Sequence, residues 1–456
     1  MTVSGSSAAG ASPTGSWPVE LAAPDIERWR GGNTGIPFFT TLDSGRPGPH
    51  AMVTAVTHGN ELCGAIVLDR FLAGDLWSTA TSAELVTLPL FILMGELLFH
   101  TRLSENLFSG LSPWTRRLPG RLLHVNVLGC TLFAAVSGSS AATTATVGRI
   151  TLKELLARGY DRNLAMGSLA GAGTLGFLIP PSIPMIVYGV LANVSILELF
   201  MAGIVPGLIL ALLYMGYLGV RTTIDPSLLP ESEPRLGWGQ KFAALLSLAP
   251  VLFLILFVIG SMYLGFASVT EAAAMGVLGA LLVALGQRTL TWRKLFDALL
   301  GTVRTCSMIG LIISGALFLS KAMARLGLPV EIAGQIEALG LHPYMLIAVL
   351  LVFYLMLGCI LDGLSAIVMT LPVTLPLVTA AGFDPIWFGV FLIVTVEMAQ
   401  ITPPVGFNLF VIQGLTGTPI LKLARAALPF CLIMVTFVVL MVLVPEVVTA
   451  LPKSLS

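Results

Sequence analysis

Four short segments interrupt the apolar stretches of this sequence, and their residue types and spacing could bind an ion or a small anion. Breaks of this kind free backbone carbonyls and helix C-termini, which suit Na⁺, and helix N-termini, which suit a carboxylate. The candidate ion- and substrate-binding residues of the first two segments are Ser137, Gly138, Ser139, Ser140, Thr143, Gly173, Thr174, Pro180, Pro181 and Ser182. Those of the other two segments are Gly358, Asp362, Gly363, Ser365, Glu397, Thr402, Pro403, Pro404 and Asn408.

The two pairs of segments form an internal repeat. Pro181 and Pro404, the second prolines of two Pro-Pro pairs, are each followed by another proline 25 residues later. A glycine precedes the same prolines by 43 residues in the first copy (Gly138) and by 41 in the second (Gly363). Small residues also let membrane helices approach closely, but breaks at matching positions of two halves favour a transport site near the bilayer midplane.

Composition places these breaks in a polytopic membrane protein. Of 456 residues, 56% are hydrophobic and only 11% charged, with a mean hydropathy of +0.92, far from the composition of a soluble domain. The net charge of zero gives no reason to expect nucleic-acid binding, and five scattered cysteines form no metal or redox motif. Basic residues at 116–121, 149–158 and 288–294 suggest cytoplasmic loops.

The predicted fold is all-α, with two structural repeats that each contain a re-entrant hairpin and a broken helix. The apolar run before Ser137 has only about fifteen residues, too few for a full crossing, so it fits one arm of a hairpin. Asp362 and Glu397 flank the breaks of the second half, and acids in such positions are usually functional. The predicted segments are a first half 77–225 (hairpin 122–156, broken helix 163–192), a linker 226–241, and a second half 242–456 (hairpin 342–378, broken helix 387–415).

Residues 1–76 read differently, as a soluble fragment or a disordered N-terminal region. An alternating run at 51–57 is followed by His-Gly-Asn-Glu, so His58 and Glu61 come directly after a predicted strand, a plausible geometry for two zinc ligands. The segment resembles the start of the succinylglutamate desuccinylase/aspartoacylase family of zinc deacylases, without that family's third ligand. Residues 1–76 are therefore interpreted as a deacylase-like fragment with a vestigial zinc motif. Two alternatives for the whole chain stay open: a non-functional or bifunctional fusion with this fragment, and a membrane-tethered zinc hydrolase.

From about residue 77 onwards, the chain resembles the large membrane subunit of TRAP transporters, the DctM-like family. The motifs that carry the resemblance are Pro-Leu-Phe-Ile-Leu-Met-Gly-Glu at 89–96, Val-Ser-Gly-Ser-Ser at 136–140, Gly-Thr-Leu-Gly-Phe-Leu-Ile-Pro-Pro-Ser at 173–182, and Thr-Pro-Pro-Val-Gly-Phe-Asn at 402–408. Members of the family normally carry further membrane helices where residues 1–76 stand here. The resemblance implies a transporter rather than an enzyme.

The same resemblance implies a sodium-coupled, elevator-type importer of organic acids in the bacterial inner membrane. Na⁺ would be the coupling ion, and no other cofactor is implied. The partners would be a small four-helix membrane subunit and an extracytoplasmic solute-binding protein. The substrate stays open among a C4-dicarboxylate, a keto acid and a sugar acid, and a channel is the competing class of membrane protein.

Overall fold

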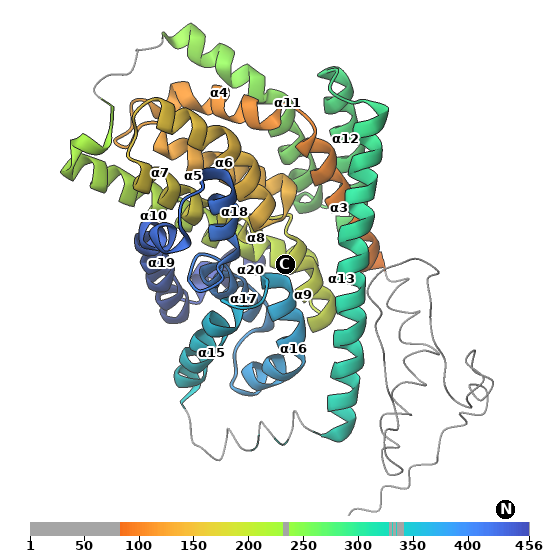
Figure 1. Cartoon of the computed structure of the whole chain (residues 1–456). Coiled ribbons are helices and arrows are strands. Elements are labelled where there is room, and N and C mark those ends of the chain that lie inside the picture. The colour runs from red at the N-terminus through yellow and green to blue at the C-terminus, as the bar shows by residue number, and fades with distance from the viewer. Residues whose placement is uncertain (1–82, 231–236, 328–330, 332–333, 335–341, 456) are drawn as a thin grey trace, which may run out of the picture. The chain divides into compact units, whose positions relative to one another are not determined.

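A computed structural model of the chain describes residues 83–230, 237–327, 331, 334 and 342–455 (Figure 1). The described residues are helical, with no β-strand among them, which confirms the predicted all-α class. The helices of the first half are α3 (Ala83–Phe99), α4 (Leu103–Thr115), α5 (Leu123–Ser137), α6 (Ser140–Ala157), α7 (Arg162–Gly173), α8 (Leu175–Leu178), α9 (Ile183–Ala192) and α10 (Ile196–Ile224). After the short 3-10 helix η3 (Pro226–Leu228) come α11 (Trp238–Tyr263), α12 (Val269–Gly286), α13 (Trp292–Leu326), α15 (Pro343–Gly358), α16 (Gly363–Ala380), α17 (Pro385–Ala399), α18 (Phe407–Thr416), α19 (Ile420–Leu443) and α20 (Glu446–Leu455).

Seven segments of the described chain are long and apolar enough to cross a membrane, which confirms a multi-pass membrane protein. They are Arg162–Ala192, Ile196–Ile224, Trp238–Tyr263, Val269–Gly286, Trp292–Leu326, Gly363–Ala380 and Ile420–Leu443. Helices α5, α15 and α17 are apolar but shorter, with 15 or 16 residues each. A straight crossing of the hydrocarbon core takes roughly 20 residues, so these three are too short to cross alone.

Local chemistry explains the breaks of the first half. Helix α5 ends because Gly138 adopts a left-handed φ of 57°, a conformation that costs glycine little. The next residue, Ser139, is extended and its side chain accepts the amide hydrogen of Ala142, which caps α6. In the broken span that follows, Ser182 caps α9 in the same way through the amide of Met185.

The second half breaks at the corresponding places. Asp362 caps α16 by accepting the amide of Ser365, and α17 begins with Asp384 as its cap and Pro385 in the first turn. After α17 the chain turns through Pro403 and Pro404, and α18 starts at Phe407. The Pro180–Pro181 and Pro403–Pro404 peptide bonds are both cis.

Helix α17 forms the centre around which the functional residues are arranged. Every residue from Trp387 to Ala399 is buried, because α8, α9, α10, α15, α16, α19 and α20 all pack against this helix. Its C-terminal end therefore carries Glu397 into the interior of the protein rather than to a surface.

Two predicted features fall partly or wholly outside this description. The predicted strand at 51–57, His58 and Glu61 lie outside the described residues. Within the predicted linker 226–241, the structure describes η3 and then the start of α11 at Trp238.

Candidate functional site

The Ser140 hydroxyl joins the two halves of the chain through buried polar contacts. Its Oγ lies 2.8 Å from Glu397 Oε2 and 3.0 Å from the carbonyl oxygen of Gly173. The amide of Asn408 donates to the same Oγ over 2.7 Å. Ser140 starts the helix after the first hairpin tip, whereas Glu397 and Asn408 stand on either side of the second Pro-Pro break. One hydroxyl thus joins three of the four predicted segments.

This cluster is closed off from the surface. Ser140 is 2% exposed, Glu397 1% and Asn408 0%. Ion pairs within the described residues link Arg158 to Glu154 and Arg221 to Asp225, and neither involves Glu397. A buried carboxyl group without a cationic neighbour is costly unless its polar partners are well placed. The contact of Glu397 with Ser140 therefore depends on this arrangement of the helices, and it connects the two halves of the chain.

Three buried oxygens near Ser140 lack a hydrogen-bond partner among the described residues: Thr144 Oγ1, Glu397 Oε1 and Asn408 Oδ1. The Phe177 backbone also interacts with the Glu397 carboxyl group. Two of the side chains converge on Gly173, where an added Cβ would lie 2.0 Å from Thr144 Oγ1 and 3.4 Å from Asn408 Nδ2. Buried polar atoms are normally satisfied, so an unpartnered group of oxygens requires an explanation such as a bound ion. Neutral and acidic oxygens are the ligands that a hard cation prefers.

Close backbone approach makes the cluster possible. A Cβ on Gly176 would come within 2.5 Å of Ser140 Cα and 2.8 Å of the Ser139 carbonyl oxygen. At the first tip, a Cβ on Gly138 would lie 2.8 Å from the Pro181 carbonyl oxygen. Only glycine lets the broken span α7–α9 and the hairpin tip come this near.

The remaining candidates of the first half complete the hairpin tip and its contact with the broken span. The hydroxyls of Ser137 and Thr143 are 2.8 Å apart, and Thr143 also donates to the Ser139 carbonyl over 2.7 Å. The amide of Ile183 donates to the Gly138 carbonyl over 3.3 Å, which ties the tip to the residue after Ser182. The hydroxyl and carbonyl groups of this tip thus bond to one another within the tip.

Thr174 and the first proline pair are buried beside this tip. The hydroxyl of Thr174 donates to the Gly171 carbonyl and lies 3.1 Å from the Tyr214 hydroxyl of α10. Pro180 and Pro181 are buried, whereas Pro403 and Pro404 are exposed. The two breaks therefore occupy different environments in this conformation.

The second hairpin tip is less engaged with the central cluster. Asp362 is exposed, and its recorded role is to cap α16 through the Ser365 amide, 3.1 Å away. Cys359 Sγ lies 3.3 Å from Thr402 Oγ1, so the second tip does contact the second break. Gly358 and Gly363 provide the close approach here, since an added Cβ would lie 2.6 Å from Ala399 Cβ and 2.7 Å from Val396 Cγ1 respectively.

The candidate set drawn from the sequence omitted some residues that the structure places in or beside the site, although Thr144 and Gly176 belong to the same two breaks. Thr144 and Gln400 each carry a buried polar atom with no recorded partner, and Gly176 sets the approach of the hairpin tip. Polar side chains inside apolar helices were the available signal, because they are rare and usually functional in membranes. A hydroxyl can also bond its own helix, as Thr151 does with the Val147 carbonyl, so the pattern alone does not separate the two roles.

Comparison with known proteins decides the family. Residues 36–447 match the family described as "Tripartite ATP-independent periplasmic transporter, DctM component". The chain belongs to this family. The chain is 34% identical over 389 residues to the C4-dicarboxylate TRAP transporter large permease protein DctM of Pseudomonas aeruginosa, covering 85% of this chain and 90% of the relative. It is 31% identical over 396 residues to the 2,3-diketo-L-gulonate TRAP transporter large permease protein YiaN of Escherichia coli, covering 85% and 92%.

The fold of this DctM-family protein also has a counterpart among solved structures. It is similar, with a TM-score of 0.62 and 15% identity, to the Alcanivorax borkumensis YdaH transporter, over 86% of this chain and 90% of that one. At this identity the likeness concerns the fold alone. Membership of the family makes the chain a transporter permease of the inner membrane rather than an enzyme.

The family match also corrects the interpretation of the N-terminal segment. Because the match begins at residue 36, it includes His58 and Glu61. The proposed resemblance of residues 1–76 to a zinc deacylase is not supported. The physical reason is the weakness of the motif: two ligand-type residues three positions apart occur often by chance, and a protein zinc site needs at least three ligands.

Proposed function

We propose that this chain is the membrane permease subunit of a Na⁺-coupled, binding-protein-dependent importer of organic acids. The observation that carries the proposal is the buried contact of Ser140 with Glu397 and Asn408, which joins the first hairpin tip to the second break. Transporters commonly bind ion and substrate where discontinuous helices of two repeats meet. Family membership gives the general class, and the contact suggests where within the chain the coupled binding takes place.

The unpartnered oxygens support Na⁺ as the ion. Thr144 Oγ1, Glu397 Oε1 and Asn408 Oδ1 are buried, and a bound cation would stabilise the ionised form of Glu397. The broken helices add backbone carbonyls, such as the Gly173 carbonyl that already contacts Ser140. A carboxylate substrate would instead favour helix N-termini, and Ser139 and Ser182 cap the N-termini of α6 and α9 close to the same tip.

An elevator movement of two repeats accords with the arrangement of the hairpins. In Figure 1, α5 and α6 lie toward one end of the molecule, and α15 and α16 lie toward the other. Both pairs contact the central part: α5 and α6 contact α8, whereas α15 and α16 contact α17. Two hairpins that approach a shared centre from opposite ends would give the site one barrier on each side, as alternating access requires.

The partners and the substrate class follow by analogy with the family. A small four-helix membrane subunit and an extracytoplasmic solute-binding protein would complete the system. The relatives are named for a C4-dicarboxylate and for 2,3-diketo-L-gulonate, both organic acids, so we propose an organic acid anion and leave the choice among a C4-dicarboxylate, a keto acid and a sugar acid to experiment.

The test is uptake by proteoliposomes that contain this chain with its small subunit and binding protein. Radiolabelled acids of the three classes are offered with and without an inward Na⁺ gradient, and we expect saturable uptake of one class that requires the gradient. Flux that does not saturate and is indifferent to Na⁺ would overturn the proposal in favour of a channel.

A matched pair of variants locates the ion. Thr144→Val removes an unpartnered oxygen, whereas Thr151→Val removes a buried hydroxyl of the same helix that bonds the Val147 carbonyl. We expect the Na⁺ concentration at half-maximal uptake to rise severalfold in Thr144→Val and to stay unchanged in Thr151→Val. Equal effects of the two substitutions would place the ion elsewhere.

A further inference from the structure

A cluster of cations and aromatic rings that the proposed function does not use lies where α4 contacts the start of α11 (Figure 1). The Nζ of Lys241 lies 5.2 Å from the ring centroid of Trp238 and 5.8 Å from that of Trp114. The guanidinium of Arg117 lies 5.4 Å from the same Trp238 ring. The indole nitrogen of Trp114 donates to the Lys241 carbonyl over 3.3 Å, so the two helices are tied together at this point.

The two cations of the cluster have no acidic partner among the described residues. The ion pairs recorded there join Arg158 to Glu154 and the α10 residue Arg221 to Asp225. Lys241 is only 4% exposed. The faces of two rings compensate a buried ammonium only in part, so Lys241 and Arg117 together favour the approach of an anion.

The surroundings of the cluster fit a lipid better than a free anion. Trp238 and Phe242 are each 59% exposed, and exposed apolar side chains continue along the same face of α11 at Leu246, Phe253 and Phe257. Tryptophan favours the membrane–water interface, where its ring sits at headgroup depth. An acyl chain could therefore follow α11 while a headgroup phosphate remains beside the cations.

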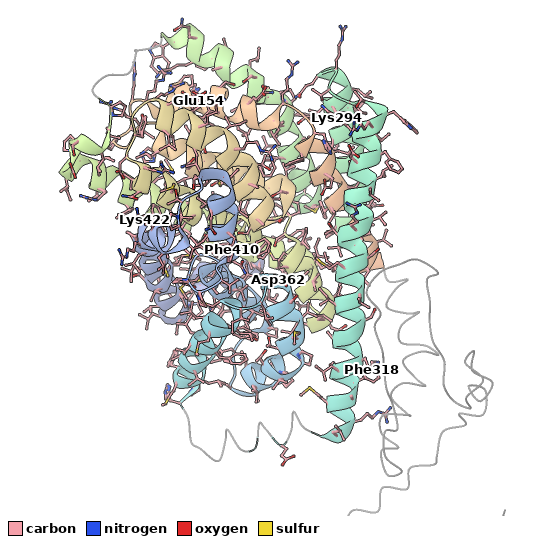
Figure 2. All side chains as sticks on the ribbon, in the orientation of Figure 1. Glu154, Lys294, Phe318, Asp362, Phe410 and Lys422 are labelled. Atoms are coloured by element: carbon pink, nitrogen blue, oxygen red, sulfur yellow. The ribbon has the colours of Figure 1, made fainter. Side chains whose placement is uncertain are left out.

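The cluster lies toward the same end of the described helices as the stretches 149–158 and 288–294, each of which contains several basic residues. Figure 2 shows Glu154 and Lys294 toward the same end, and Figure 1 places α4 there as well. Basic loops mark the cytoplasmic side of a membrane protein. Anionic phospholipids attract basic groups that lie at a membrane surface.

We propose that this cluster is a binding site for an anionic phospholipid of the cytoplasmic leaflet. The lipid phosphate binds beside the exposed Arg117 guanidinium at the Trp238 ring, which the Lys241 ammonium also contacts. An acyl chain lies along the exposed face of α11. The lipid thereby fixes the junction of α4 and α11 at headgroup depth. This proposal is independent of the coupling ion and of the substrate.

The test uses the purified full chain in a nonionic detergent. Phosphatidylglycerol or phosphatidylcholine is added in mixed micelles, and bound lipid is counted by native mass spectrometry while thermal unfolding is followed in parallel. We expect phosphatidylglycerol to be retained and to raise the unfolding temperature. Lys241→Met and Arg117→Gln together should weaken this retention on the order of tenfold, because two cations act on one anionic lipid.

Control variants distinguish lipid binding at this cluster from nonspecific attraction of lipid to other basic residues. Arg288→Gln with Arg293→Gln removes two exposed cations of the other basic connector and should leave retention unchanged. If Lys241→Met does not fold, Arg117→Gln alone still decides, because Arg117 is exposed. The proposal fails if the control pair loses as much lipid as the test pair, if Arg117→Gln retains lipid fully, or if inorganic phosphate gives the same protection as phosphatidylglycerol.

Discussion

Replacing Gly176 by alanine is expected to push the first hairpin tip away from the broken span. The new Cβ would lie 2.5 Å from Ser140 Cα and 2.7 Å from its amide nitrogen, where ordinary contact begins at 3.4 Å. These are backbone atoms that cannot rotate aside, so the tip has to shift by about 0.9 Å, the difference between 3.4 and 2.5 Å. Because Ser140 holds Glu397 and Asn408, the same shift would stretch the central contacts.

The energy of this substitution has two opposing parts. Alanine in place of glycine favours a helix by up to about 1 kcal/mol, and Gly176 lies within α8. Overpacking of a close-packed interior costs about 1–3 kcal/mol, and the loss of a buried hydrogen bond adds a comparable amount. The net expectation is a destabilisation of about 1–5 kcal/mol together with a loss of most of the Na⁺-dependent uptake.

The assay is thermal or denaturant unfolding of the purified variant, combined with uptake by proteoliposomes. Gly216→Ala is the matched control, because Gly216 lies within a membrane helix, α10, and its added Cβ would meet no atom within 4 Å. This control should keep wild-type uptake and gain slightly in stability. Wild-type stability and uptake in Gly176→Ala would refute the reasoning that this glycine sets the position of the tip.

Three further predictions follow from the geometry of the breaks. Ser140→Ala and Asn408→Ala should each lower the free energy of unfolding by about 1–3 kcal/mol. The double variant should lose less than the sum of the two, because both substitutions remove the same hydrogen bond between Asn408 and Ser140. Additive losses measured by denaturant unfolding would contradict this. Asp362→Ala should lower the free energy of unfolding by about 0.5–2 kcal/mol, because the cap of α16 is lost, whereas Asp362→Asn should keep both the stability and the Na⁺ dependence of uptake. If uptake by the asparagine variant no longer responds to Na⁺, the carboxylate takes part in ion binding instead. Gly138→Ala should cost at least about 1–2 kcal/mol from its left-handed φ of 57°, seen as a lower unfolding temperature, and an unchanged temperature would show that the tip relaxes freely.

Local sequence was sufficient to predict where the helices break. Gly138, Ser139 and Ser182 act through their own backbone preference or through a side chain that reaches an amide three residues on. Interactions over one turn of chain depend little on the rest of the fold, so composition and spacing predict them. The same holds for the apolar spans, because the thickness of a bilayer sets their length.

Local sequence was a poorer guide where a segment takes its structure from its neighbours. The stretch 103–115, polar in its first turns, forms α4, which packs along α11. Gly110 lies in that contact, and a Cβ there would come within 2.5 Å of Leu248 Cγ. Most of the stability of such a helix comes from packing rather than from intrinsic propensity, and the packing partner lies more than a hundred residues away.

Only the tertiary structure decided which of the candidate residues meet. Ser140 contacts Glu397 across 257 positions and Asn408 across 268, whereas Asp362, equally prominent in the sequence, is exposed and caps a helix. The repeat in the sequence shows that the two breaks correspond, but it does not say how far apart they lie in the folded protein. Their meeting depends on α17 being surrounded on every side, so that its C-terminal end carries an acid to the buried tip of the first hairpin.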